Sequence, residues 1–217
     1  MSAILPPNPP APDFGVGDLF GIEPVRLVMR PLFKLDEDQF FELVCQNPDQ
    51  PLEQNAQGEV IIMSPTGSYS GWQNSEILFQ LMRWNKEHHR GLVFDSSSLF
   101  RFPNRAALSP DAAWIEKSRW ERLTLKQQKG IAPVSPNFVI ELRSENDRLE
   151  NLQDKLAQYL ANGVEVGWII DPLLKQVHVY EAGQSVRIFD HPQTVAGTGC
   201  IQGFVLDLRE IFAERQE

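Results

Sequence analysis

The sequence predicts a mixed α/β fold, in which helices flank a β-sheet with parallel and antiparallel strands. The main observation is an apolar strand at 137–143, a helical pattern at 147–162 and a second apolar strand at 166–171. A strand–helix–strand unit of this kind most often forms two parallel strands joined by a right-handed crossover. The strands at 112–116 and 176–181 alternate more between apolar and polar residues, so they could pair antiparallel at the flanks of the sheet.

One domain accounts for most of the chain. The 217 residues suffice for a single domain with a sizeable core, which we place at 26–217, although two small domains would also fit. Residues 1–25 are expected to form a proline-rich N-terminal arm. Five prolines fall within 4–12 alone, and proline favours extended backbone.

The remaining elements follow from hydrophobic periodicity and from the residues that end helices and strands. Gly91 is the expected C-cap of the first long helix, and Asn146 or Asp147 is the expected N-cap of the second. The expected helices are 35–47, 71–91 and 147–162, with a short helix or loop at 118–130. The expected further strands lie at 58–65, within 92–102, at 185–189 and at 203–208.

Several features favour a cytoplasmic protein that does not enter a membrane. No apolar run approaches the roughly 18 residues that a bilayer-spanning helix needs. The N-terminal residues lack the basic region and apolar core of a signal peptide. Cys45 and Cys200 are isolated and lack metal-binding spacing, as expected of free thiols in a reducing compartment.

The charge of the chain argues against general affinity for nucleic acid. The formal net charge is −9, whereas binding to phosphate backbones needs clustered lysine and arginine. A role with nucleic acid would therefore require local basic patches or bound cations. One segment offers basic residues that could contact phosphates or could simply form a solvated surface: Lys117, Arg119, Arg122, Lys126 and Lys129.

Two carboxylates fall at strand ends that could meet. Asp111 begins the strand at 112–116, and Glu141 lies near the end of the strand at 137–143. If these strands are antiparallel neighbours, both carboxylates lie at one end of the sheet. Close carboxylates repel unless a positive charge lies between them, and a hard divalent cation such as Mg²⁺ is a natural occupant. The alternative is a pair of solvated strand-end carboxylates.

A single lysine in the following helix could reach the same end of the sheet. Lys155 lies at the margin of the helix's leucine stripe, just outside Tyr159. From there its ammonium could extend to the strand end, although a surface lysine on the helix flank is the alternative. Arg143 follows Glu141 by two residues and is expected on the same sheet face, where it could form a salt bridge with the carboxylates.

These residues carry a resemblance to a known family. "SPDAAWIEKSRW" and "PNFVIELRSENDRLENLQDKLAQYLANGVEVGWIIDP" closely resemble the Uma2 endonuclease family, common in cyanobacteria, of the PD-(D/E)XK nuclease superfamily. The likeness extends over roughly 30–210 and includes "GEVIIMSPTG", "LFRFPN" and "GFVLDL". It implies a restriction-endonuclease-like core and metal-dependent cleavage of nucleic acid.

The resemblance also implies roles for particular residues. Asp111 matches the aspartate of the PD motif and Glu141 the acidic residue of the ExK element, so both would bind Mg²⁺ or Mn²⁺. Arg143 stands where the superfamily usually has lysine, which departs from the pattern. Lys155 resembles a lysine that has migrated to the following helix, where it would orient the attacking water.

Further active-site residues are expected from the N-terminal part of the chain. Glu53 resembles a family position that adds an acidic group to the site. Glu76 is the rival, although it lies off the apolar arc of its helix. Asn74 and Gln158 could line the same cleft.

The function that the resemblance implies is a divalent-metal-dependent endonuclease acting on nucleic acid, with DNA as the expected substrate. It is expected to form a homodimer, as related nucleases often do. The alternative is a catalytically silent binding or assembly module, in which Arg143 would close the site by pairing with Glu141. A small-molecule hydrolase finds no support, because the chain lacks the Gly-x-Ser-x-Gly, Walker and His-Glu-x-x-His motifs.

Overall fold

A six-stranded mixed sheet organises the part of the chain that the computed structural model describes, residues 25–27, 35–63 and 66–213. Its strands are β4 (Gly91–Asp95), β7 (Ala112–Glu116), β8 (Phe138–Leu142), β9 (Val166–Asp171), β10 (Gln176–Glu181) and β11 (Arg187–Asp190). They lie in the order β11-β10-β9-β8-β7-β4. β8 and β9 pair parallel, and the other neighbours pair antiparallel.

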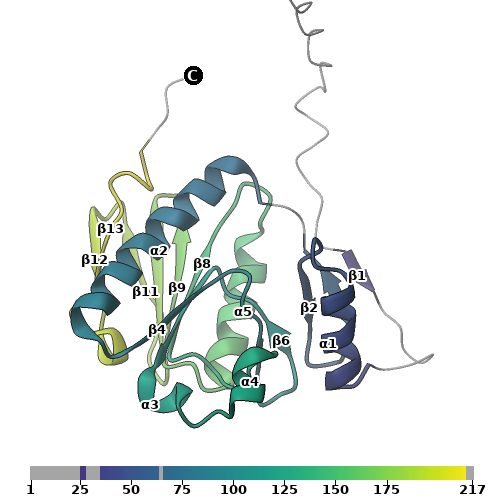
Figure 1. The fold of residues 1–217 in the computed structure, drawn as a ribbon. Coiled ribbons are helices and arrows are strands. Elements are labelled where there is room, and N and C mark those ends of the chain that lie inside the picture. The colour runs from purple at the N-terminus through teal and green to yellow at the C-terminus, as the bar shows by residue number, and fades with distance from the viewer. Residues whose placement is uncertain (1–24, 28–34, 64–65, 214–217) are drawn as a thin grey trace, which may run out of the picture.

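One helix covers each face of this sheet (Figure 1). α5 (Leu149–Ala161) connects β8 to β9 and buries Leu152, Leu156 and Tyr159 against one face. α2 (Ser68–His88) packs on the opposite face. The predicted strand–helix–strand unit and the mixed sheet flanked by helices are therefore confirmed.

A smaller five-stranded sheet lies beside the main sheet and forms, with one helix, an N-terminal lobe (Figure 1). Its strands are β1 (Val25–Leu27), β2 (Leu52–Gln54), β3 (Val60–Ile62), β5 (Phe100–Arg101) and β6 (Ala107–Leu108), in the order β1-β3-β2-β6-β5. α1 (Glu37–Gln46) packs on it through Phe40, and Asp36 caps this helix reciprocally with Gln39. Since β6 leads directly into β7, the lobe is held close to the start of that strand.

Short elements complete the described part of the chain. α3 (Lys117–Trp120) and α4 (Leu125–Lys129) follow β7, in the segment expected to be a short helix or loop. β12 (Thr194–Ala196), η1 (Gly199–Ile201) and β13 (Val205–Asp207) form a hairpin that packs beside α2. The Gln80 side chain of α2 bonds to both backbone groups of Asp207, which fixes β13 against the helix.

Two predicted helix ends are wrong, one because of a contact distant in sequence and the other because of a local hydrogen-bonded turn. His89, in the left-handed region at φ 52°, ends α2, whereas Gly91 begins β4. Glycine is required at 91 because an added Cβ would lie 2.4 Å from Trp114 Cε2. The N-cap of α5 is Arg148, because the Asp147 carboxylate accepts hydrogen bonds from both the N–H and the hydroxyl of Ser144.

Other expectations fall partly or wholly outside the described residues. The proline-rich arm at 1–25 lies almost entirely there, so the division into an arm and a single domain stays a prediction. Among the residues that are described, none of the helices has the length and apolar character needed to cross a bilayer. Cys45 is exposed, Cys200 is partly buried, and both are free thiols.

Candidate active site

The pairing of β7 with β8 brings the two predicted carboxylates together. Ala112 lies opposite Ile140, and one further step in this register places Asp111 opposite Glu141. The Oδ2 atom of Asp111 accepts a hydrogen bond of 2.8 Å from the N–H of Leu142, which joins the start of β7 to the end of β8. Both carboxylates therefore lie at one end of the sheet, on the face that α5 covers.

Asp111 lies in a confined polar environment. Burial raises the pKa of its carboxyl, while the Leu142 N–H and the nearby Lys155 lower it. The Nδ2 atom of Asn74, from α2, lies 3.4 Å from Asp111 Oδ1, a long hydrogen bond. The Oδ1 atom of Asn74 is buried and has no hydrogen-bond partner in the described structure. Asp111 and Asn74 thus offer oxygen atoms that a cation or water could use.

Glu141 is buried from solvent but not isolated. Its Oε1 accepts a hydrogen bond of 2.9 Å from the hydroxyl of Tyr159 and lies 3.1 Å from Lys155 Nζ. Burial, together with the neighbouring carboxylates Asp111 and Glu53, raises the pKa of Glu141 to about 8, even though Lys155 acts to lower it. Protonation of Glu141 is therefore coupled to the charges of these neighbours.

Lys155 lies between two carboxylates that are 88 positions apart in the sequence (141 minus 53). Its Nζ is 3.2 Å from Glu53 Oε1 and 3.1 Å from Glu141 Oε1. It also donates to the carbonyl of Ser109 at 3.2 Å. Burial acts to lower the pKa of Lys155, but the carboxylates Glu141, Glu53 and Asp111 outweigh it, so the pKa is raised and the ammonium stays charged.

Ser109 ties the N-terminal lobe to this cluster. Its N–H donates to Glu53 Oε1 at 2.9 Å, and its carbonyl accepts from Lys155. Glu53 is the middle residue of β2 and is buried, so the N-terminal lobe contributes one carboxylate to this cluster. We refer below to Asp111, Glu141, Lys155 and Glu53 as the acidic–lysine cluster.

Asn74 contacts the cluster through Asp111, as expected of a residue that lines the cleft, whereas Arg143, Glu76 and Gln158 have no recorded contact with it among the described residues. Arg143 forms a 2.8 Å ion pair with Asp171 and donates to the Asp147 carbonyl, so the expected pairing of Arg143 with Glu141 is wrong. The cause is register: Leu142 lies opposite Ile170 in the parallel pair, which places Arg143 next to Asp171. Glu76 on α2 and Gln158 on α5 are both half-buried.

Two participants were not predicted from the sequence. Tyr159 is fully buried one helical turn after Lys155, and its hydroxyl reaches Glu141. Ser109 immediately precedes the Pro110–Asp111 pair. For Tyr159, the sequence signal was its spacing of four residues from Lys155, because side chains at that spacing lie on the same helix face.

The donor set fits a hard divalent cation that keeps several water ligands. Within the described ranges, no three His, Cys, Asp or Glu side chains are grouped so as to enclose a metal by themselves. Mg²⁺ does not require such a cage, because it is commonly held by one or two carboxylates with water and phosphate oxygens completing its shell. Asp111 and Glu141 supply two carboxyl groups, and a bound cation would favour their ionised forms over the protonated forms that burial favours.

The sequence from 37 to 209 matches the Uma2 family, described as "Putative restriction endonuclease". This chain belongs to the Uma2 family. Among solved structures, it is similar to a protein from Anabaena variabilis described as "a putative nuclease belonging to DUF820". The identity is 23%, the TM-score is 0.61, and the match covers 74% of this chain and 89% of the other. No match is found among curated proteins.

These comparisons agree with the geometry at the level of fold. The structural likeness supports a restriction-endonuclease-like mixed sheet flanked by helices for this Uma2 protein, as predicted. The matched region includes all four residues of the acidic–lysine cluster.

Proposed function

We propose that this Uma2 protein is a divalent-metal-dependent endonuclease that hydrolyses phosphodiester bonds, with DNA as its substrate. The observation that carries the proposal is the position of Lys155, which is charged and lies between Glu53 and Glu141 at the sheet end that also holds Asp111. The family description as a restriction endonuclease supports DNA as the substrate.

In this proposal Asp111 and Glu141 hold Mg²⁺ or Mn²⁺. The cation would supply the activation of water and the stabilisation of charge that develops on the scissile phosphate. It would also reduce the repulsion between this acidic cluster and the phosphate backbone. Tyr159 keeps the Glu141 carboxylate in place by donating to its Oε1 atom.

Lys155 acts as a hydrogen-bond donor and not as a base. Because its pKa is raised, it keeps its proton at neutral pH and can orient the attacking water or neutralise a phosphate oxygen. Glu53 and the Ser109 carbonyl hold the ammonium in position from the N-terminal side. This accounts for a lysine that comes from the helix instead of from the strand position of Arg143.

The alternative is a catalytically silent binding or assembly module, favoured by the low pI and by arginine in place of the ExK lysine. Its closing contact between Arg143 and Glu141 is replaced by the ion pair of Arg143 with Asp171. We further propose a homodimer in the cytoplasm. Light scattering of the purified chain measures the mass in solution, and a mass near 25 kDa, that of a single chain, would contradict the dimer.

Cleavage assays test the proposal directly. Supercoiled and single-stranded DNA are incubated with the protein and Mg²⁺, Mn²⁺ or EDTA. We expect metal-dependent cleavage that falls by about 100-fold or more in Asp111→Asn and in Lys155→Ala, the range seen on removing one group that stabilises a transition state. Glu87→Gln is the matched control, because it neutralises an exposed carboxylate on α2. Absence of cleavage, together with absence of Mn²⁺ binding by calorimetry, would refute the proposal.

A further inference from the structure

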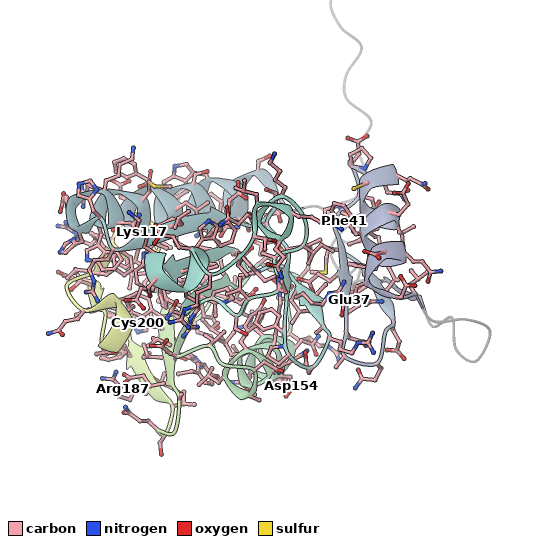
Figure 2. The ribbon with its side chains drawn as sticks, turned by 60° about the horizontal axis from the view of Figure 1, so that its bottom comes forward. Glu37, Phe41, Lys117, Asp154, Arg187 and Cys200 are labelled. Carbon is pink, nitrogen blue, oxygen red and sulfur yellow. The ribbon has the colours of Figure 1, made fainter. Side chains whose placement is uncertain are left out.

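A hollow of about 220 Å³ is lined by residues of the N-terminal lobe, of β4 and of the segment that carries α3 and α4. Its apolar lining includes three aromatic side chains, Phe41 from α1, Phe94 from β4 and Trp120 from α3. Phe41, labelled on α1 in Figure 2, is 38% exposed, so its ring is available to a ligand. The rings of Phe94 and Trp120 lie 4.9 Å apart and form a continuous aromatic wall.

The polar part of the lining consists of groups that can meet a base or a phosphate. Ser97, Gln128 and Lys129 contribute to it. The amide nitrogen of Gln128 donates to the Trp120 and Leu123 carbonyls, which leaves its oxygen to act as acceptor for a ligand N–H. α4 carries two basic residues and no acidic residue, unlike the acidic chain as a whole.

One residue connects this hollow to the proposed catalytic groups. The Ser109 hydroxyl donates to the carbonyls of Ser96 and Ser98, and Ser98 lines the hollow. The backbone of the same Ser109 bonds to Glu53 and Lys155. Ser109 therefore links the wall of the hollow to the cluster, although the cluster residues themselves do not line the hollow.

We propose that the hollow binds one unpaired nucleobase of the nucleic acid, next to the phosphate at the acidic–lysine cluster, with Phe41 and Trp120 as its aromatic partners. This inference rests on the proposed function, because it assumes a nucleic acid at that cluster. It adds that the substrate has an unpaired base beside the cleavage position. Single strands, flaps or extruded bases would bind better than intact duplex.

Size and chemistry favour a base over other occupants. A cavity of about 150 Å³ is sufficient to bind benzene, so 220 Å³ accommodates a larger aromatic ring. Bases stack on aromatic side chains without needing a defined sequence, and basic groups at the rim can hold the adjoining phosphates. Lys126 and Lys129 lie exposed on α4 at that rim.

The test measures binding without cleavage, in EDTA, so that it is independent of catalysis. The probes are short single-stranded oligonucleotides that carry 2-aminopurine at one position, the same oligonucleotides with an abasic position, and the matching duplex. Phe41→Ala removes one aromatic partner. Phe79→Ala is the matched control, because Phe79 is an exposed phenylalanine on α2, away from the hollow.

A second variant fills the hollow and does not depend on removing a core contact. An added Cβ at Gly130 would lie 3.9 Å from the Phe41 ring, an ordinary contact distance, so the side chain of Gly130→Leu projects into the hollow. Gly67→Leu is its control, since a Cβ there meets nothing within 4 Å. Circular dichroism establishes that each variant is folded before binding is compared.

We expect Phe41→Ala and Gly130→Leu to weaken single-strand binding by roughly 5-fold to 100-fold, the range for losing one base–aromatic stack. Both should also remove the fluorescence change of 2-aminopurine, and the two controls should leave binding unchanged. Removing the base from the probe should weaken binding to the wild type. The loss should equal the loss that Gly130→Leu causes for the intact probe.

Three results would overturn the proposal. The first is equal binding of the intact and abasic probes, and the second is unchanged binding in both hollow variants. The third is a loss of self-association in Gly130→Leu without loss of DNA binding. That result would assign the hollow to contact between copies of the chain. If the wild type binds the probes as expected but cleaves no DNA with metal, the base site stands and the proposed chemistry fails.

Discussion

The hydroxyl of Tyr159 provides a sharp test of how the site is held together. Tyr159→Phe keeps the ring in the core and removes one donor, the 2.9 Å hydrogen bond to Glu141 Oε1. Hydrogen bonds to charged groups contribute about 1.5–3 kcal/mol to stability. Since Lys155 still lies 3.1 Å from the same oxygen, the acceptor keeps a partner and the lower value applies. Burial and nearby carboxylates raise the pKa of Tyr159, so the hydroxyl remains a donor at every assay pH.

We therefore expect Tyr159→Phe to lower the free energy of unfolding by about 1.5 kcal/mol, which corresponds to a decrease in Tm of roughly 3–6 °C for a chain of this size. Urea unfolding followed by tryptophan fluorescence measures the first quantity. A carboxylate that has lost its orienting partner should also bind Mn²⁺ more weakly, by about 10-fold to 100-fold. Calorimetric titration measures that loss.

The control is Tyr180→Phe, which makes the same chemical change at a half-buried position on β10. A Tyr159→Phe protein with unchanged stability would refute the hydrogen bond as a stabilising contact. A protein that is destabilised but binds Mn²⁺ as the wild type does would refute the positioning role of Tyr159 while leaving its structural role intact.

Three further predictions follow from the contacts. Lys155→Met leaves the buried Glu141 without its neighbouring ammonium, so it should destabilise by about 3 kcal/mol at pH 8 and by less at pH 5, where the raised pKa of Glu141 keeps this carboxyl protonated. Urea unfolding that gives equal losses at both pH values would contradict this. Gly91→Ala should destabilise the protein by about 1–3 kcal/mol, because the added methyl group overpacks against Trp114. Gly71→Ala in α2 has open space around the added methyl group and should stabilise by up to about 1 kcal/mol. A change of the same sign in both variants would count against the steric argument. Burial raises the pKa of Cys200 to about 12, so a thiol reagent at pH 8 should modify exposed Cys45 quickly and Cys200 slowly, and equal rates would show that Cys200 is accessible.

The convergence of Asp111, Glu141 and Lys155 could be anticipated because it depends on local rules. The two carboxylates lie at ends of strands that are neighbours in sequence, and such strands usually pair. Lys155 lies in the helix that directly follows β8, at a margin that faces the sheet end. Hydrophobic periodicity and the order of the elements along the chain indicate these positions, and the resemblance to Uma2 proteins adds the expected roles of the three residues.

The partners of Glu53 and Arg143 could not be obtained in this way. Nothing in the local sequence around Glu53 says that β2 pairs with β6, yet the single register contact between Gln54 and Ala107 brings the lobe beside Ser109. Arg143 has several carboxylates within reach in the sequence. The parallel register of β8 and β9 selects Asp171, because that register sets which side chains are neighbours.

The sequence by itself determined the mixed sheet, the strand–helix–strand unit and the placing of two carboxylates and a lysine at one sheet end, because period and chain connectivity constrain these features locally. Only the tertiary structure decided that Lys155 lies between Glu141 and Glu53, that Tyr159 orients Glu141 and that residues of the N-terminal lobe, of β4 and of the segment with α3 and α4 line an aromatic hollow. Those features depend on strand registers and on the packing of the N-terminal lobe. Contacts between distant segments set both, and no local pattern encodes them.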